Sequence, residues 1–172
     1  DIRDVYGNDA VTGKGDENVT VTDTPNATDA DAIADATTGI VTATLDMTAV
    51  TNAATFKTFV DTLTDDQVNA YTVEMPVIAV NAADLLALDG KTSVTIDATA
   101  VTGMTGTYDD LKAVLDADEA ADGIDTETGN TDGVNLTVTE ADLTTQASIS
   151  VTQANTLNGY DEVAVITATI TN

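Results

Sequence analysis

The sequence predicts a strand-rich α+β fold in which a degenerate three-fold β-α-β repeat places short helices over a sheet. Threonine and valine are abundant, and their branched side chains favour the pleated surface of a strand. Apolar and polar residues alternate in several stretches, which indicates half-buried strands. Short alanine-rich stretches that end at glycine lie between them and favour helices. An all-β, sandwich-like fold is the alternative.

Three segments of the chain can be aligned with one another, at about 19–52, 71–103 and 136–172. Each opens with a strand-like x-Thr-Val-x pattern and continues into a short helix and an alternating strand. Leu45-Asp46 and Ile96-Asp97, each followed closely by Thr-Ala-Val-Thr, link the first two segments most clearly. A repeat at this spacing is typical of folds assembled from stacked supersecondary units.

The ends of the short helices are predicted from residue type. Polar residues that can cap a helix N-terminus occupy equivalent places in the three segments: Thr28, Asn81 and Thr152. Glycines follow each helix and are expected to end it in a left-handed conformation: Gly39, Gly90 and Gly159.

Two longer helices are expected between the repeats, in TFKTFVDTLT and TYDDLKAVLDA. Thr55 and Thr107 are the expected N-caps, and Asp110 stands where an acid completes a capping box. The large side chains share one face of each helix, so we expect them to be buried against the sheet: Phe56, Phe59, Leu63, Tyr108, Leu111 and Leu115.

The predicted organisation is an N-terminal extension or linker over 1–18 and a single repeat-built domain over 19–172, with an acidic loop at 116–133. The last segment, EVAVITATITN, is expected to form one uninterrupted alternating strand. Such a strand either closes its own sheet or offers an edge to a strand of another subunit. Residues 1–18 are one candidate for the donated segment, and a plain linker is the other interpretation.

Charge restricts the classes of partner. Thirty acidic and five basic residues give a formal net charge of −25. Such a surface repels nucleic acid and anionic lipid, and no apolar run is long enough for a membrane helix, so neither nucleic-acid binding nor membrane insertion is expected. Copies of the chain also repel one another unless salt or divalent cations intervene. An extracellular, salt- or calcium-rich location therefore fits the composition.

Catalysis is not expected. The chain has no histidine and no cysteine, which removes the commonest general base and the thiolate nucleophile. It contains no Gly-x-Ser-x-Gly elbow and no phosphate-binding Gly-Lys-Ser/Thr loop. Paired carboxylates are the chemistry that stays open, but among thirty acids a close pair has little specificity.

One segment concentrates oxygen ligands suited to a hard cation. Calcium takes six to eight oxygen ligands, and an acidic loop with glycine turns can surround it. The candidate calcium ligands are Asp116, Asp118, Glu119, Asp122, Asp125, Glu127 and Asp132. The spacing is not that of an EF-hand, and a solvated acidic loop is the other interpretation. A weaker candidate comprises Asp9, Asp16 and Glu17.

The stretches NAADLLALDGKTSVTIDATAVTGMTGTYDDLKAVLDA and VTQANTLNG resemble the Ala/Thr/Asp-rich repeats of large secreted bacterial surface proteins, including S-layer proteins and RTX-type adhesins. The resemblance covers about 19–172. It implies a non-catalytic structural subunit of an S-layer, matrix filament or adhesin on the cell surface, which self-assembles with identical subunits. The RTX calcium-binding nonapeptide is absent. An adhesin module that recognises a glycan or a host protein is the alternative function.

Overall fold

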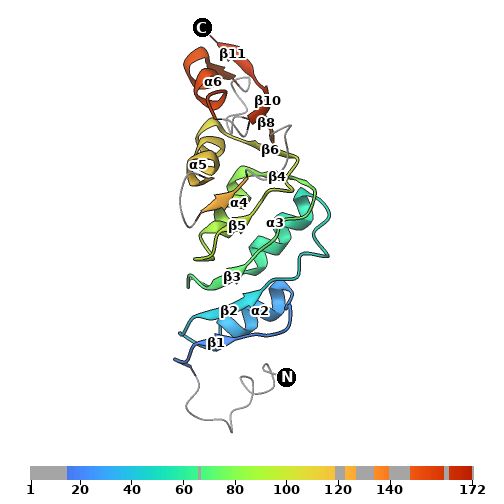
Figure 1. The fold of residues 1–172 in the computed structure, drawn as a ribbon, viewed down its shortest axis with the longest axis vertical. Coiled ribbons are helices and arrows are strands. Elements are labelled where there is room, and N and C mark those ends of the chain that lie inside the picture. The colour runs from blue at the N-terminus through green and yellow to red at the C-terminus, as the bar shows by residue number, and fades with distance from the viewer. Residues whose placement is uncertain are drawn as a thin grey trace.

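A computed structural model describes residues 15–65, 67–118, 123–126, 134–139, 148–160 and 163–171, and the structural statements below concern these residues. The molecule is elongated, and the chain advances along its long axis from the N-terminus at one end to the C-terminus at the other (Figure 1). Segments that neighbour each other in space are therefore mostly consecutive turns of the chain.

The described residues contain helices and strands in alternation, which confirms the predicted strand-rich α+β class rather than an all-β sandwich. The helices are α2 (Ala27–Ala34), α3 (Ala53–Thr62), α4 (Ala82–Asp89), α5 (Tyr108–Asp118) and α6 (Val151–Leu157). The strands are β1 (Val19–Thr20), β2 (Val41–Thr44), β3 (Ala70–Thr72), β4 (Ala79–Asn81), β5 (Ile96–Asp97), β6 (Gly103–Gly106), β7 (Ile124–Asp125), β8 (Val134–Val138), β9 (Ser148–Ser150), β10 (Val163–Thr167) and β11 (Thr169–Thr171).

All strand pairs between these elements are parallel, because each strand bonds to a strand of the next turn of the chain. One sheet has the order β1-β2-β3, and a second has the order β10-β8-β6-β4. The pairs β5-β7 and β11-β9 complete the set. Two isolated parallel bridges, Asn69 with Thr92 and Glu74 with Asp97, connect the β3 segment to the β5 segment. The result is a stack of coils in which each coil contacts mainly its neighbours, as in solenoid proteins.

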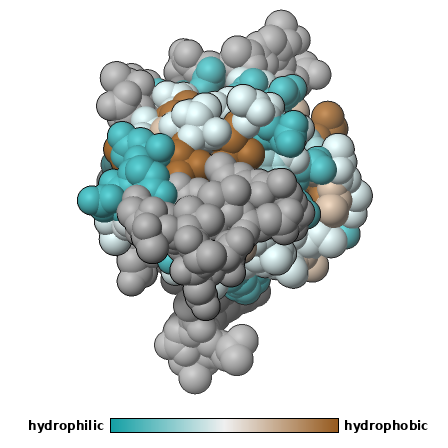
Figure 2. Space-filling view, turned by 90° about the horizontal axis from the view of Figure 1, so that it is seen from below, coloured by the Kyte–Doolittle hydropathy of each residue, from teal (hydrophilic) through white to brown (hydrophobic). Residues whose placement is uncertain are grey.

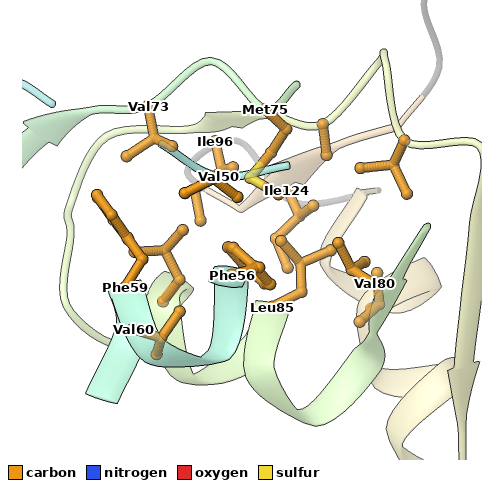
Figure 3. Close-up of a cluster of buried hydrophobic side chains, with 14 of the residues drawn as sticks. Val50, Phe56, Phe59, Val60, Val73, Met75, Val80, Leu85, Ile96 and Ile124 are labelled. Atoms are coloured by element: carbon orange, nitrogen blue, oxygen red, sulfur yellow. The ribbon is translucent and has the colours of Figure 1, made fainter. Parts of the chain in front are cut away.

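The helices pack on one another in chain order, α2 on α3, α3 on α4 and α4 on α5. Phe56 of α3 is fully buried, and its ring lies between the Val73–Met75 strand segment and Leu85 of α4 (Figure 3). Five of the six large helix side chains expected to be buried are below one-tenth exposed, and Tyr108 packs partly buried against the same core. The apolar faces of both longer helices are thus as predicted.

The helix N-caps differ from the predicted ones in two of the three short helices. Asn81 caps α4 as expected, and its side-chain oxygen accepts the N–H of Ala83 at 2.9 Å. The α2 cap is Asn26 and the α6 cap is Ser150, each two residues before the threonine that was expected. Asn26 and Ser150 accept a backbone N–H of the first turn, so each helix begins where the earlier polar side chain already provides the bond.

Of the two longer helices, α3 has a different N-cap from the predicted one and α5 has the predicted one. Asn52, not Thr55, caps α3, and Thr55 is the third helical residue, whose hydroxyl accepts the Asn52 N–H at 3.1 Å. Thr107 precedes α5 as expected and accepts the N–H of Asp110 at 3.1 Å. The Thr107 hydroxyl also donates to the Asp110 carboxylate at 2.8 Å.

The prediction that a glycine ends each short helix in a left-handed conformation is wrong. Gly90 is the C-cap of α4 but has φ −63°, and neither Gly39 nor Gly159 has positive φ. Gly159 follows the α6 C-cap by one residue, whereas Gly39 lies four residues beyond the α2 C-cap. Gly39 is required for another reason. A Cβ there would lie 2.1 Å from the carbonyl oxygen of Glu17, because two chain segments cross closely at this point.

The C-terminal strand is also interrupted, contrary to the expected continuous alternation. The register between β10 and β8 shifts between Val163 and Val165, and Ala168 separates β10 from β11. Val163 pairs with Val134 and Ile166 with Leu136, so these two side chains share one side of the strand. A bulge of this kind changes which residues face the core.

Candidate functional site

The first candidate is the acidic segment 116–133, which begins in the last turn of α5. Asp116 accepts a hydrogen bond from the Lys112 Nζ at 2.5 Å and another from the Tyr160 hydroxyl. These two bonds, that of Lys112 foremost, lower the pKa of the Asp116 carboxyl below its usual value. Both oxygens of Asp116 are thus engaged by side chains of the protein.

Asp118 makes a hydrogen bond to the backbone of a later segment. Its Oδ1 accepts the backbone N–H of Thr126 at 2.6 Å, which ties the end of α5 to the residue after β7. Asp125 lies in β7 and is half-buried. The other predicted ligands, Glu119, Asp122, Glu127 and Asp132, lie outside the described residues. Among the residues that are described, no group of three or more Asp, Glu, His or Cys side chains is arranged to hold a metal ion.

The weaker N-terminal candidate is also partly outside the described part of the chain, because it includes Asp9. Glu17 accepts the backbone N–H of Gly15 at 2.7 Å and that of Asp16 at 3.1 Å. The carbonyl oxygens of Gly15 and Glu17 in turn accept hydrogen bonds from Thr38 and Thr37. Residues 15–17 therefore lie against the turn before β2, while the interpretation of 1–18 as an extension or linker stays a prediction.

The second candidate is a row of carboxylates on the outer side of the coils. Asp97 is the bridge partner of Glu74 and the register partner of Asp125. Continuing the β2–β3 register by two residues places Asp46 beside Glu74, and the hydrogen bond from Leu45 N–H to the Thr72 carbonyl supports that continuation. We call these four residues the acidic row. Strand neighbours are about 4.8 Å apart, so the row carries one carboxylate at each such step.

A row of hydroxyl side chains runs beside the acidic row. Thr44 and Thr72 are register partners, and both are exposed. The bridges on either side place Thr95 in the next coil at the same level. This outer face of the sheet is therefore polar, regular along the long axis, and negatively charged along one line.

The acidic row corresponds to a local sequence pattern that the overall composition does not reveal. Each of its acids directly follows a buried aliphatic residue at the end of a strand segment: Leu45-Asp46, Val73-Glu74, Ile96-Asp97 and Ile124-Asp125. The alignment of the repeats predicts the equivalence of only the first and third of these pairs. Asp46 and Asp97 each accept the N–H of the threonine two residues on, at 2.9 and 3.2 Å, so the two turns have the same local structure.

The third candidate is a groove of about 560 Å³ between the N-terminal end of α2 and α3. Its apolar lining residues include Ala49, Val50 and Phe59. Its polar lining residues include four threonines, Asp29 and Asp46. The backbone N–H of Thr48 and then its hydroxyl donate to Asp46 and lower the pKa of that carboxyl, so this carboxylate is ionised at neutral pH.

Comparison with known proteins adds no assignment, because no family model, no curated protein and no solved structure matches this chain. Within the described part of the chain, no helix combines the length and the apolar character needed to cross a membrane. The class defined by the fold is thus an elongated stack of parallel β-strands and helices with an acidic outer row.

Proposed function

We propose that this chain is a non-catalytic structural module of an extracellular bacterial surface assembly, such as an S-layer, a matrix filament or an adhesin, and that it acts through protein–protein contacts with identical subunits. The observation that supports this most directly is the stacking of coils by parallel strands, which ends in strands with an unpaired edge among the described residues. An exposed strand edge is a template for a strand of another chain.

The composition supports the same proposal. An elongated module with a net charge of −25 stays soluble and separate in dilute salt, whereas salt or divalent cations screen the repulsion between copies. Assembly would then follow export into a salt-rich medium. The lack of histidine and cysteine is consistent with a module that carries no chemistry of its own.

Electron microscopy of the purified protein tests this proposal. We expect filaments or sheets in millimolar calcium and dispersed particles after a chelator is added. Dispersed particles in both conditions, and at high protein concentration, would contradict an assembly role.

The groove between α2 and α3 favours a second candidate function, an adhesin module that recognises a glycan or a host protein. Its mixture of apolar and polar lining residues is that of a ligand pocket, and its size is within the usual range. In that case the protein stays monomeric and binds a partner. Substituting Thr58, whose hydroxyl bonds to the Ala54 carbonyl on α3, by a bulky residue would then abolish binding without unfolding the protein.

A further inference from the structure

The groove between the N-terminal end of α2 and α3 lies wholly within the described part of the chain, because its lining residues fall between Asn26 and Thr62. Ala27, Val50 and Phe59 are each less than one-tenth exposed, whereas the polar lining residues are partly buried or exposed. The apolar side chains therefore lie deeper in the groove than the polar ones. A volume of about 560 Å³ is enough for a small organic molecule with an apolar body.

The groove is a more specific feature than the apolar surface at the nearby β1 end. Figure 2, which shows the molecule from that end, has hydrophobic side chains in the middle and hydrophilic ones around them. The groove instead has walls from three segments, namely α2, α3 and the turn after β2 that carries Asp46 and Val50. These walls define both a volume and a set of polar groups that can select a ligand.

The charged groups that line the groove are all negative. They are Asp29 in the first turn of α2 and Asp46, and none of the described lining residues is Lys or Arg. The N-terminus of α2 favours an anion through the helix dipole, but that effect is equivalent to only about half a positive charge. The two carboxylates outweigh it, so the groove attracts cations.

The threonine hydroxyls of α3 offer the groove acceptors rather than donors. Thr58 Oγ1 donates its proton to the Ala54 carbonyl at 3.0 Å, and Thr62 Oγ1 donates to the Thr58 carbonyl at 2.8 Å. A hydroxyl has one proton and two lone pairs, so both oxygens can still accept hydrogen bonds. Asp46 accepts the Thr48 N–H at 2.9 Å through Oδ1, and a carboxylate with about four lone-pair sites can accept more. The lining therefore matches a ligand that donates hydrogen bonds.

An organic cation fits this lining better than a metal ion does. Among the described residues, no group of three or more Asp, Glu, His or Cys side chains is arranged to hold a metal. Val50 and Phe59 offer a metal no ligand atoms, whereas they can cover the apolar body of an organic molecule. The aromatic ring of Phe59 can also attract a positive charge.

We propose that this groove binds a small organic ammonium ion, with its nitrogen at the Asp46 carboxylate and its apolar body against Val50 and Phe59. The ammonium N–H groups donate to the carboxylate and to the threonine oxygens of α3, and Asp29 adds negative charge. The site goes beyond the proposed assembly function and does not depend on it. It also names a ligand chemistry for the groove of the second candidate function.

Isothermal titration calorimetry on the 172-residue chain, at neutral pH and fixed ionic strength, tests the proposal. The probes are phenethylamine, phenethyl alcohol and hydrocinnamate, which have similar shapes and are positive, neutral and negative. We expect phenethylamine to bind at one saturable site. The alcohol should bind at least about tenfold more weakly, because it cannot form a charge-assisted bond to Asp46, and hydrocinnamate should not bind measurably.

Asp46→Asn keeps the shape of the side chain and removes its charge, so it should weaken phenethylamine binding at least about tenfold. The control is Asp109→Asn, which removes the same charge from the first turn of α5, outside the groove. This control is needed because a chain with a net charge of −25 attracts any cation. It should bind phenethylamine like the wild type. Thermal unfolding followed by circular dichroism establishes that each variant is folded.

Thr58→Leu tests the same site without changing a charge, and it serves if Asp46→Asn does not fold. Thr58 is exposed on α3, and a larger apolar side chain there should fill the groove and abolish phenethylamine binding. The matched control is Thr156→Leu on α6. The Thr156 hydroxyl also donates to the carbonyl four residues earlier, at 3.0 Å, but it lies outside the groove. This variant should keep the affinity of the wild type.

Four results would overturn the proposal. They are a wild type that does not bind phenethylamine, an alcohol that binds as tightly as the amine, equal weakening by Asp46→Asn and Asp109→Asn, and displacement of the amine by millimolar calcium at the same ionic strength. The second result would indicate a purely apolar site, the third a general effect of charge, and the fourth a metal site. A protein that forms filaments in calcium but binds no amine would refute only this ligand and leave the assembly function standing.

Discussion

Glu74 and Asp97 are partners in a parallel β-bridge that joins two successive coils. The N–H of Met75 donates to the Asp97 carbonyl at 2.7 Å, and the N–H of Asp97 donates to the Val73 carbonyl at 3.0 Å. Two like charges thus occupy neighbouring positions on one face of the strands. Such pairs oppose the pairing that holds them together, so the acidic row weakens the stack at low ionic strength.

Replacing Glu74 by Gln should therefore stabilise the protein, by about 0.5 kcal/mol in low salt, with the gain shrinking as salt is added. Asp109→Asn is the matched control, because it removes the same charge from the first turn of α5, where a carboxylate favours the helix. It should lower the melting temperature. Equal changes in stability in both variants would mean that stability depends on the total charge and not on the acidic row.

Tyr71 is 2% exposed, and its hydroxyl has no hydrogen-bond partner among the described residues. Burial, with the nearby carboxylates of Asp65 and Asp31, raises the pKa of this hydroxyl well above its ordinary value. Tyr71→Phe removes the buried polar atom and should stabilise the fold by about 1 kcal/mol in urea unfolding. Tyr160→Phe, which loses a bond to Asp116, should not be stabilising. A Tyr71→Phe protein less stable than wild type would point to a partner for the hydroxyl.

Two glycines that look alike in the sequence should respond differently to alanine. Gly39→Ala brings a Cβ to within 2.1 Å of the Glu17 carbonyl oxygen and should cost about 2 kcal/mol through displacement of the β1 segment. Gly90→Ala meets nothing nearer than 3.6 Å in an ordinary helical conformation, and its effect should stay within about 0.5 kcal/mol. The denaturant midpoints of the two variants measure this difference. Equal losses of stability would instead indicate that both glycines are left-handed.

Burial raises the pKa of Asp89, at the end of α4, above the ordinary value. A carboxyl with a raised pKa in the folded state destabilises the protein at neutral pH, and that cost disappears as pH falls through the folded pKa toward the ordinary value of about 4. Asp89→Asn should therefore raise the free energy of unfolding at pH 7, and this gain should disappear on acidification.

Asp46→Ala should show the opposite dependence on pH, because hydrogen bonds from Thr48 lower the pKa of Asp46. Its loss of stability should be present at pH 7 and diminish at low pH.

Calcium should raise the melting temperature if the acids of 116–132 bind it, because a ligand that binds only the folded state adds to its stability. Since Asp116 is held by Lys112 and Tyr160, Asp116→Asn should leave most of the calcium shift intact, whereas Asp125→Asn should reduce it. Melting curves with chelator and with millimolar calcium measure both. A midpoint that calcium does not move would identify the segment as solvated surface.

Local pattern was enough to predict much of this fold. The alternation of Val and Thr located β1, β2 and β8, and the spacing of Phe56, Phe59 and Leu63 identified the buried face of α3. These features depend on residues within a few positions of one another, where periodicity and side-chain shape act directly. The N-cap positions were harder to predict. Two nearby polar residues are able to bond the first turn in each case, Asn26 or Thr28 for α2 and Ser150 or Thr152 for α6. Small differences in backbone geometry decide which of the two becomes the cap.

The sequence by itself determined most of the elements, their apolar faces and the acidic, repetitive character of the chain. Only the tertiary structure decided which elements meet. Parallel register between coils aligned Asp46, Glu74, Asp97 and Asp125 into one row, although loops of unequal length separate them in the chain. The crossing of Glu17 over Gly39 and the free edge of β10 arose in the same way. These relationships depend on contacts between distant segments, which local residue preferences do not encode.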